Sequence, residues 1–412
     1  MRLLIVSQYF WPESFRINDL AVGLAERGHE VTVLTGKPNY PEGRFFSSYG
    51  FFHHTRDDYH DVNVVRVPLI PRGGGGKLRL ALNYASFALF ASLLGPFRCH
   101  GRFDAILVYE PSPVTVGLPA LVIKKFNGAP VLFWVQDLWP ESLSATGAVR
   151  SHTLLGLVER LVRFIYRGCD RILIQSLAFS EPIQRLGVKN DRILYFPNSA
   201  EDFYEPLDTD QAPHGAVLPA GFRVMFAGNM GAAQALDTIL AAAERLRNQP
   251  DIHWIILGDG RLASWVKDEV ARRGLERCVH LLGRHPAESM PRWFALADAM
   301  LVTLRREPIF ALTIPSKVQS YMACAKPIIA ALDGEGGRIV RESGAGIAVA
   351  AEDPDALAQA VLKMYKVPGT ERREMGLQGR RYFEAHFERR MLLERLDHWL
   401  NDLVRQPDQC AS

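Results

Sequence analysis

The chain alternates near-continuous apolar strands with helical segments, and this alternation starts again after the middle of the sequence. Strands of this kind are buried on both faces, which is typical of a parallel sheet with helices on both sides. The sequence therefore predicts an α/β fold with two Rossmann-like, doubly wound parallel-sheet domains facing a cleft. The strands predicted in the first half are Leu3–Ser7, Val31–Thr35, Val62–Val67, Ala105–Tyr109, Val131–Val135 and Arg171–Gln175. Those predicted in the second half are Arg223–Ala227, His253–Leu257, Val279–Leu282, Ala299–Leu304, Pro327–Leu332 and Gly346–Val349.

A break in the alternation marks the expected domain boundary. Residues 197–220 contain four prolines and little periodicity, and we expect them to form a linker. A chain of 412 residues is long enough for one domain on each side of it, over 1–196 and 221–371. The pattern of residues 372–412 is strongly helical. We expect C-terminal helices here that either stay on the second domain or cross back to the first.

Composition excludes several classes of protein. The net charge is +3, from 48 basic and 45 acidic residues, which is too small to indicate a nucleic-acid partner. The five cysteines are scattered without CxxC spacing, so we expect reduced thiols, mostly in the core, and no metal site. The N-terminus runs directly into a strand pattern, and we expect no signal peptide.

One long apolar segment bears on membrane contact. From Leu80 to Phe97 there are 18 residues without a charge, between the basic residues Arg79 and Arg98. The length reaches the lower limit for a membrane span, but the place between two predicted strands suits a crossover helix. A buried crossover helix, a helix lying in the bilayer surface and a span all stay open. Basic flanks favour an anionic surface, so we expect the helix over 78–98 to contact the inner face of the cytoplasmic membrane peripherally.

The segment Ile314–Ile329 predicts an anion site. Pro315 suits the first turn of a helix, and Pro327 ends that helix before a buried strand. Ser316 and Lys317 stand at the start of the helix, where unpaired backbone N–H groups carry the positive end of the helix dipole. Such a site suits a diphosphate. An ordinary cap with a solvated lysine is the alternative.

Several loops that follow the strands of the second domain are rich in glycine and polar residues. In an open parallel sheet the carboxyl ends of the strands meet at the ligand-binding edge. Glycine lets the backbone approach a phosphate, and no GxGxxG motif indicates a dinucleotide cofactor. We therefore expect a nucleotide diphosphate at this edge and no cofactor. The candidate contact residues are Gly228, Asn229, Gly231, Gln234, Gly258, Gly260, Arg284, Arg305 and, in a flexible loop over 333–337, Glu335.

The first domain contains the tetrapeptide Trp-Pro-Glu-Ser twice, over 11–14 and 139–142, and Asp137-Leu138 stands directly before the second copy. Each copy follows a predicted strand. Trp139 offers an apolar plate for a sugar ring, and Glu13, Asp137 and Glu141 offer carboxylates that orient hydroxyls or accept a proton. The alternative is a pair of Trp-Pro loops that pack over strand ends. The segment 39–43 either reaches the same edge or forms a plain turn.

Taken together, these residues resemble the retaining GT-B glycosyltransferases of family 4, and within it the branch that builds bacterial surface polysaccharides with amino or deoxy sugars. The resemblance covers nearly the whole chain. One difference is that the Glu-x7-Glu pair of the wider family is replaced by Leu312 and Ser320. The matching segments are Leu24–Thr35, Pro38–Pro41, Asp137–Ser142, Gly228–Gly231, Leu236–Thr238, Gly258–Gly260, Leu282–Arg284 and Ile314–Lys317.

The resemblance implies transfer of a sugar, of the N-acetylated amino or deoxy kind, from a UDP-sugar on the second domain to a lipid-diphosphate-linked saccharide on the first. It implies that Lys317 stabilises the leaving diphosphate, with Arg284 or Arg305, and that no metal is required. Asp137 is the first candidate to orient or deprotonate the acceptor hydroxyl, followed by Glu13 and Glu141. A UDP-sugar 2-epimerase of the same fold and a non-catalytic transferase-like scaffold are the alternatives.

Overall fold

A computed structural model describes residues 1–405 of the chain, except 75, 146–148, 150 and 214. The chain divides into two compact units. The first contains Met1–Phe196 together with the chain from Leu393 onward, and the second contains Pro197–Leu392. The stretch predicted as a linker, 197–220, groups with the second unit. Among the cysteines, Cys99, Cys169 and Cys324 are buried and Cys278 is half-buried, all four with free thiols, while Cys410 lies outside the described residues.

The first unit is built on an eight-stranded sheet of order β3-β4-β2-β1-β5-β6-β7-β8. All neighbouring strands are parallel except β3 and β4. Its strands are β1 (Arg2–Val6), β2 (Glu30–Gly36), β3 (Arg56–Tyr59), β4 (Val62–Val67), β5 (Ala105–Glu110), β6 (Val131–Val135), β7 (Arg171–Ile174) and β8 (Ile193–Tyr195). Its helices are α1 (Arg16–Glu26), α2 (Lys77–Arg98), α3 (Gly117–Asn127), α4 (Glu141–Ala145), α5 (His152–Gly168), α6 (Ser180–Arg185) and the larger part of α15 (Arg389–Arg405).

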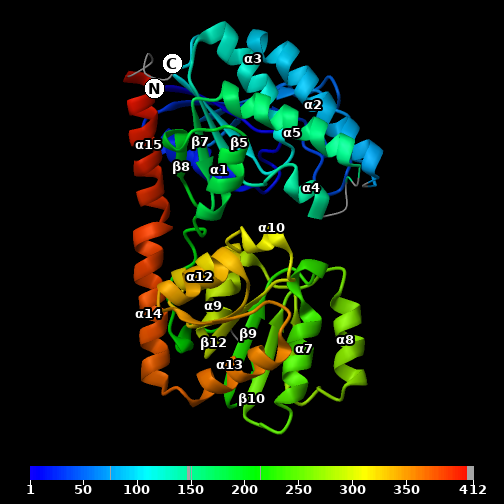
Figure 1. Cartoon of the computed structure of the whole chain (residues 1–412), viewed down its shortest axis with the longest axis vertical. Coiled ribbons are helices and arrows are strands. Elements are labelled where there is room, and N and C mark those ends of the chain that lie inside the picture. The colour runs from blue at the N-terminus through cyan, green and yellow to red at the C-terminus, as the bar shows by residue number, and fades with distance from the viewer. Residues whose placement is uncertain (75, 146–148, 150, 214, 406–412) are drawn as a thin grey trace. The chain divides into compact units, whose positions relative to one another are not determined.

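The helices cover both faces of this sheet because its crossovers run in two directions from β1. The α1 crossover leads from β1 to β2, whereas α2, α3 and α5 carry the chain the other way, toward β7. Because each crossover is right-handed, crossovers that move in opposite directions along the sheet place their helices on opposite faces of it. Helices α2, α3 and α5 therefore form one layer, in which α2 packs against α3 and α3 against α5 (Figure 1).

The second unit is built on a six-stranded parallel sheet of order β11-β10-β9-β12-β13-β14. Its strands are β9 (Phe222–Ala227), β10 (Ile252–Leu257), β11 (Val279–Gly283), β12 (Ala299–Thr303), β13 (Ile328–Ala331) and β14 (Gly346–Val349). Its helices are α7 (Leu236–Arg245), α8 (Ala263–Arg272), α9 (Met290–Ala295), α10 (Pro308–Ala311), α11 (Ser316–Ala323), α12 (Gly334–Glu342), α13 (Pro354–Lys366) and α14 (Gly369–His386). The predicted α/β class with two parallel-sheet domains is confirmed.

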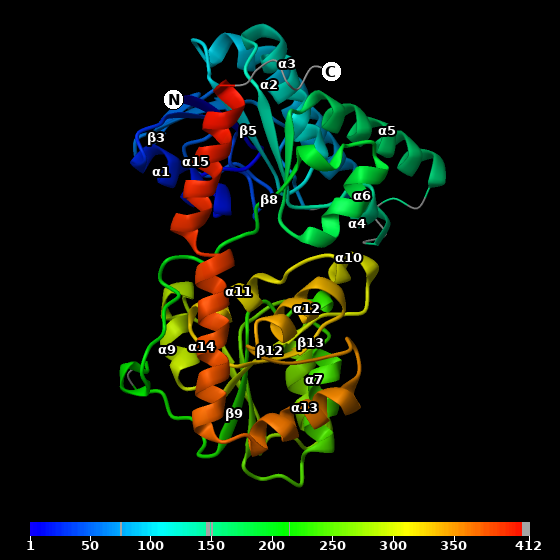
Figure 2. The ribbon, with the colours of Figure 1, turned by 60° about the vertical axis from the view of Figure 1, so that its left-hand side comes forward.

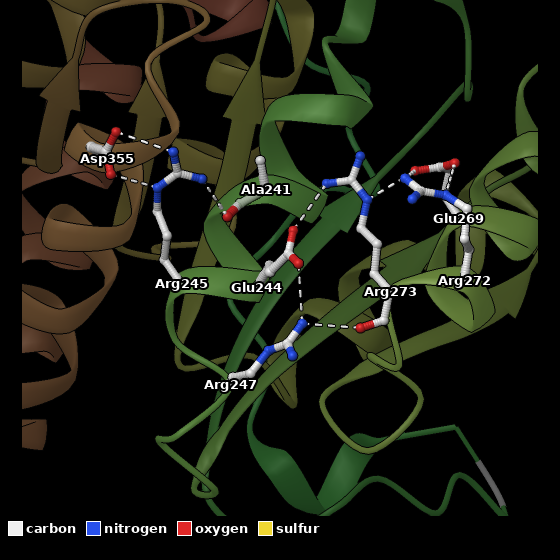
Figure 3. Close-up of polar contacts among 8 residues, drawn as sticks. All are labelled: Ala241, Glu244, Arg245, Arg247, Glu269, Arg272, Arg273 and Asp355. Atoms are coloured by element: carbon white, nitrogen blue, oxygen red, sulfur yellow. Dashed lines mark hydrogen bonds and ion pairs between the residues drawn. The ribbon is translucent and has the colours of Figure 1, made fainter.

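Two apolar cores fill the second unit, one on each face of the sheet. Residues of α7, α8 and α13 form one core, and residues of α9, α11, α12 and α14 form the other. Figure 2 shows α14 running beside α11, against which it packs. Charged side chains join α7 to its two neighbouring helices (Figure 3). Arg245 of α7 bonds Asp355 of α13, and Glu244 of α7 pairs with Arg273, the residue that follows α8.

The prediction of a flexible loop over 333–337 is wrong, because the segment begins helix α12 at Gly334. The glycines that suggested a loop are required by close packing. A Cβ atom on Gly336 would lie 2.9 Å from Cδ of Pro315, and one on Gly337 would lie 2.6 Å from the carbonyl oxygen of Leu332. Glycine costs helix stability, but here only glycine fits.

Candidate active site

The loops that follow β9 and β10 contact each other at the carboxyl edge of the second sheet. Gly228, Gly258 and Gly260 have φ angles of 134°, 149° and 152°, which side chains rarely adopt. A Cβ on Gly258 would lie 1.9 Å from the carbonyl oxygen of Gly228, and one on Gly260 would lie 2.5 Å from Oδ1 of Asn229. These predicted residues therefore lie together, on backbone that only glycine can form.

Lys317 approaches the same loops from the second position of α11. Its Nζ donates a hydrogen bond to Oε1 of Gln234 and lies 4.0 Å from the centre of the Phe226 ring. A Cβ on Gly228 would lie 2.7 Å from Cε of this lysine. Burial lowers the pKa of Lys317 to about 7, and no carboxylate among the described residues pairs with it. The ammonium is thus held, without a counter-ion, beside loops that expose backbone.

The start of α11 supports an anion site at this place. The helix begins at Ser316, whose side chain is exposed, and among the described residues no side-chain hydrogen bond caps its start. Ser320, at the position of the wider family's glutamate, is buried and donates a hydrogen bond from Oγ to the carbonyl oxygen of Ser316, 3.2 Å away. The hydroxyl of Ser320 is thus occupied within the helix.

The two predicted arginines differ in their surroundings. Arg305 donates from Nε to the carbonyl oxygen of Ala232 at 2.7 Å, and its backbone N–H donates to Ala233 at 2.9 Å. Arg305 therefore holds the turn that carries Gln234. Arg284 is exposed after β11 and forms no hydrogen bond or ion pair with any residue in the described part of the chain.

The two remaining candidates of this unit have local partners. Gly231 lies against Asn229, since a Cβ on it would be 3.0 Å from Nδ2 of that exposed side chain. Glu335 is buried on α12 and accepts hydrogen bonds from Arg338 at 2.7 and 2.9 Å. Arg338, one helical turn away, neutralises this carboxylate. The contact that the structure shows for Glu335 is therefore with its own helix.

In the first unit, Glu13 holds a backbone turn. Its Oε1 accepts hydrogen bonds from the backbone N–H groups of Asn39 and Tyr40, each at 2.7 Å, and the side chain is buried. Burial raises the pKa of Glu13 to about 7. This anchoring places the 39–43 segment at the carboxyl edge of β1 and β2, where an aromatic cluster of Tyr9, Phe15 and Tyr40 also lies.

Asp137 follows β6 at the same edge of the first sheet. Burial raises its pKa to about 6, and the nearby side chains of Ser142 and Trp139 oppose this shift. Glu141 is exposed at the start of α4, and its charge also raises the pKa of Asp137. Trp139 is only 8 % exposed, so it packs over the strand end, as the alternative interpretation expected, and offers little surface to a sugar ring.

Sequence reasoning missed a buried carboxyl group beside Asp137. Glu110 ends β5 and is fully buried, and its Oε2 lies 3.4 Å from the backbone nitrogen of Asp137. Its Oε1 finds no hydrogen-bond partner among the described residues. Burial raises the pKa of Glu110 well above its usual range, and the charge of Asp137 adds to this. The available signal was a single glutamate at the end of an apolar strand.

Two family models match this chain, one on each of the two sheet-containing units. Residues 14–199 match the model of the "Glycosyl transferase 4-like domain", and residues 221–366 match the model of "Glycosyl transferases group 1". The two matches fall on the two sheets described above. The protein is a glycosyltransferase.

Two similar proteins are also named as glycosyltransferases. The putative colanic acid biosynthesis glycosyl transferase WcaI of Escherichia coli is 24 % identical to this glycosyltransferase over 336 residues, covering 78 % of this chain and 81 % of WcaI. The probable glycosyltransferase WbjE of Pseudomonas aeruginosa is 32 % identical over 259 residues, covering 59 % and 63 %.

Solved structures show the GT-B fold. Sucrose-phosphate synthase from Thermosynechococcus elongatus superposes with a TM-score of 0.73 at 15 % identity, covering 98 % of this chain and 99 % of that one. Anabaena Alr3699/HepE, solved in complex with UDP and glucose, superposes with a TM-score of 0.68 at 15 % identity, covering 97 % and 99 %. The predicted GT-B fold of this glycosyltransferase is confirmed.

Proposed function

We propose that this glycosyltransferase moves a sugar from a UDP-sugar to a lipid-diphosphate-linked saccharide in the synthesis of a surface polysaccharide, with retention of configuration. The observation that carries the proposal is the ammonium of Lys317, held without a carboxylate partner among the described residues beside Gly228 and the uncapped start of α11. A diphosphate supplies the missing negative charge. The UDP complexes of Alr3699/HepE support a UDP-sugar donor, and the name of WcaI supports a surface polysaccharide as product.

The chemistry follows from where charge develops. When the bond between the anomeric carbon and the UDP oxygen breaks, negative charge grows on the diphosphate, and Lys317 with the N-terminal amides of α11 stabilises it. The acceptor hydroxyl forms the new bond to the anomeric carbon, and its proton passes to the carboxylate of Asp137. Asp137, with its pKa raised to about 6, is ionised at neutral pH and accepts a hydrogen bond from that hydroxyl.

A transfer assay tests this function. Purified enzyme is incubated with a panel of UDP-sugars and a lipid-linked saccharide extract, and product is followed by mass spectrometry and by the anomeric coupling in NMR. We expect transfer with the anomeric configuration of the donor, and a loss of about 10²-fold or more in Lys317→Ala and Asp137→Asn. Lys267→Ala, an exposed lysine on α8, is the matched control.

The alternatives give different results in the same assay. A UDP-sugar 2-epimerase converts the donor without any acceptor, and a scaffold binds UDP in calorimetry but turns nothing over. Full transfer rates in folded Lys317→Ala and Asp137→Asn enzymes would show that the site is assigned to the wrong residues.

A further inference from the structure

Helix α2 buries two polar residues, Asn83 and Ser86, beside small and apolar ones, and it exposes an apolar face. Asn83 and Ser86 are buried, and they bond to the chain beneath them. Asn83 accepts from Gln8 at 2.7 Å and donates to the carbonyl oxygen of Ile70 at 2.6 Å, while Ser86 accepts from the N–H of Ile70 at 2.9 Å. Between Leu80 and Phe97 every exposed residue is apolar, namely Ala81, Leu82, Ala85, Leu89, Leu93 and Phe97. A helix facing water has the opposite pattern.

The apolar surface continues over the two neighbouring helices. Of the sixteen large hydrophobic side chains exposed on the described chain, nine lie on α2, α3 and α5. Among them, Phe126 of α3 is 74 % exposed, and Leu157 and Phe164 of α5 are 62 % and 60 % exposed. These three helices form one layer on the first sheet (Figure 1). Such a concentration marks an interaction surface.

The same layer is strongly basic. Helices α2, α3 and α5 contain eight lysines and arginines and one acidic residue, Glu159, a net charge of +7 (eight minus one) against +3 for the whole chain. On α5 the exposed residues Leu157, Arg160, Phe164 and Arg167 follow at helical spacing, so basic and apolar groups share one stripe. On α3 the exposed Lys125 adjoins Phe126.

We propose that the outer surface of α2, α3 and α5, here called the docking face, binds the surface of an anionic lipid bilayer. Exposed apolar side chains enter the acyl boundary while lysines and arginines meet the lipid phosphates. A second copy of the chain is a poor occupant, because two faces that both carry exposed lysines and arginines repel each other. By length and composition α2 is apolar enough to cross a membrane. Its inward polar contacts and the buried Phe87 hold it on the sheet, so it lies in the plane of the interface.

Vesicle flotation tests the docking face without any substrate, so its result is separate from that of the transfer assay. Full-length protein is mixed with vesicles of phosphatidylcholine alone or of phosphatidylcholine with phosphatidylglycerol. We expect flotation with the anionic vesicles, weakened by added salt, and little with the zwitterionic ones. The triple variants Leu89→Ser/Leu93→Ser/Phe97→Ser and Lys125→Glu/Arg160→Glu/Arg167→Glu should each lower the partition coefficient by about tenfold or more.

Matched variants on the second unit serve as controls. Trp265→Ser/Leu281→Ser removes exposed apolar groups, and Lys267→Glu/Arg277→Glu reverses exposed charges, and both should float like the wild type. Circular dichroism checks that all variants are folded. The proposal is overturned if the docking-face variants float like the wild type. It is equally overturned if lipid-free protein is a dimer in sedimentation and the serine variant is a monomer, because another copy then covers this face.

Discussion

The ammonium of Lys317 lies 4.0 Å from the centre of the Phe226 ring and hydrogen-bonds the neutral amide of Gln234. An aromatic face attracts a cation, but it compensates only part of the lost hydration. Burial accordingly lowers the pKa of Lys317 to about 7. The charge on this side chain near neutral pH is therefore sensitive to any anion that binds beside it.

Binding of UDP should take up a proton above pH 7. In the free enzyme Lys317 loses its proton as the pH rises through about 7, and a bound diphosphate raises the pKa of the ammonium again. We expect the calorimetric heat of UDP binding at about pH 8, where the phosphate of UDP is already fully ionised, to depend on the ionisation enthalpy of the buffer. Lys317→Arg stays charged and should show no uptake. Equal heats in two buffers for the wild type would refute this linkage.

Lys317→Met should fold more stably than the wild type while losing UDP affinity. The folded-state pKa of about 7 lies below the usual 10.5, so the partly buried lysine costs stability at neutral pH. We expect a gain of about 1–3 kcal/mol in urea unfolding at pH 7. Between the folded-state and the usual pKa of lysine, the unfolded chain binds more protons than the folded chain. The wild type should therefore gain stability as the pH rises, and the stability advantage of Lys317→Met should shrink. A less stable Lys317→Met would show that the lysine supports the fold.

Transfer should decline as the pH falls through about 6. The pKa of Asp137 is raised to about 6, mainly by burial, and only the ionised carboxylate accepts a hydrogen bond from the acceptor. In a plot of kcat/KM against pH, the wild type should show this acid limb. Asp137→Asn should be slower by about 10²-fold and should lack the limb. The range from about pH 5 to about pH 8 extends one unit or more on each side of this pKa. A wild-type profile that is flat over this range would contradict the role of Asp137.

Glu110→Gln should keep activity and improve stability at higher pH. Burial raises the pKa of Glu110 above its unfolded value, so the stability it gives is complete at low pH and is lost as the pH rises through the folded-state pKa. The groups that face Glu110 are Asp137 on the loop after β6 and Tyr166 on α5, whose hydroxyl also has no partner among the described residues.

The glutamine of Glu110→Gln has the shape and the neutral charge of a protonated glutamate. Thermal unfolding from pH 5 to 9 should therefore show a flatter curve for the variant, while Glu110→Ala, which leaves a cavity, should be less stable by about 1–3 kcal/mol. Identical pH dependence in wild type and Glu110→Gln would show that Glu110 is not the group that titrates.

The sequence predicted the sheets well because apolar strands buried on both faces leave a strong pattern. It also predicted that Gly228, Gly258 and Lys317 lie together, because parallel strands bring their carboxyl ends to one edge. The short strand Arg56–Tyr59 was missed because it pairs at the sheet edge and carries polar residues.

Other features depend on tertiary contacts that spacing does not reveal. The 333–337 segment is rich in glycine like a loop, yet Pro315 packs so closely on it that glycine is needed within a helix. Trp139 is buried although its place after a strand suited a ligand contact. Glu110 was missed because its significance comes from its distance to Asp137, 27 residues along the chain.

The place of helix α15 in the first unit has a consequence for folding during synthesis. The first unit includes the chain from Leu393 onward, where Asp397 bonds His29 at 3.1 Å and the ring of Trp399 contacts Phe196. During synthesis these residues leave the ribosome after the entire second unit. The sheet of the first unit therefore waits, with part of its surface uncovered, until the whole second unit has been synthesised, and the second unit can complete its own fold first.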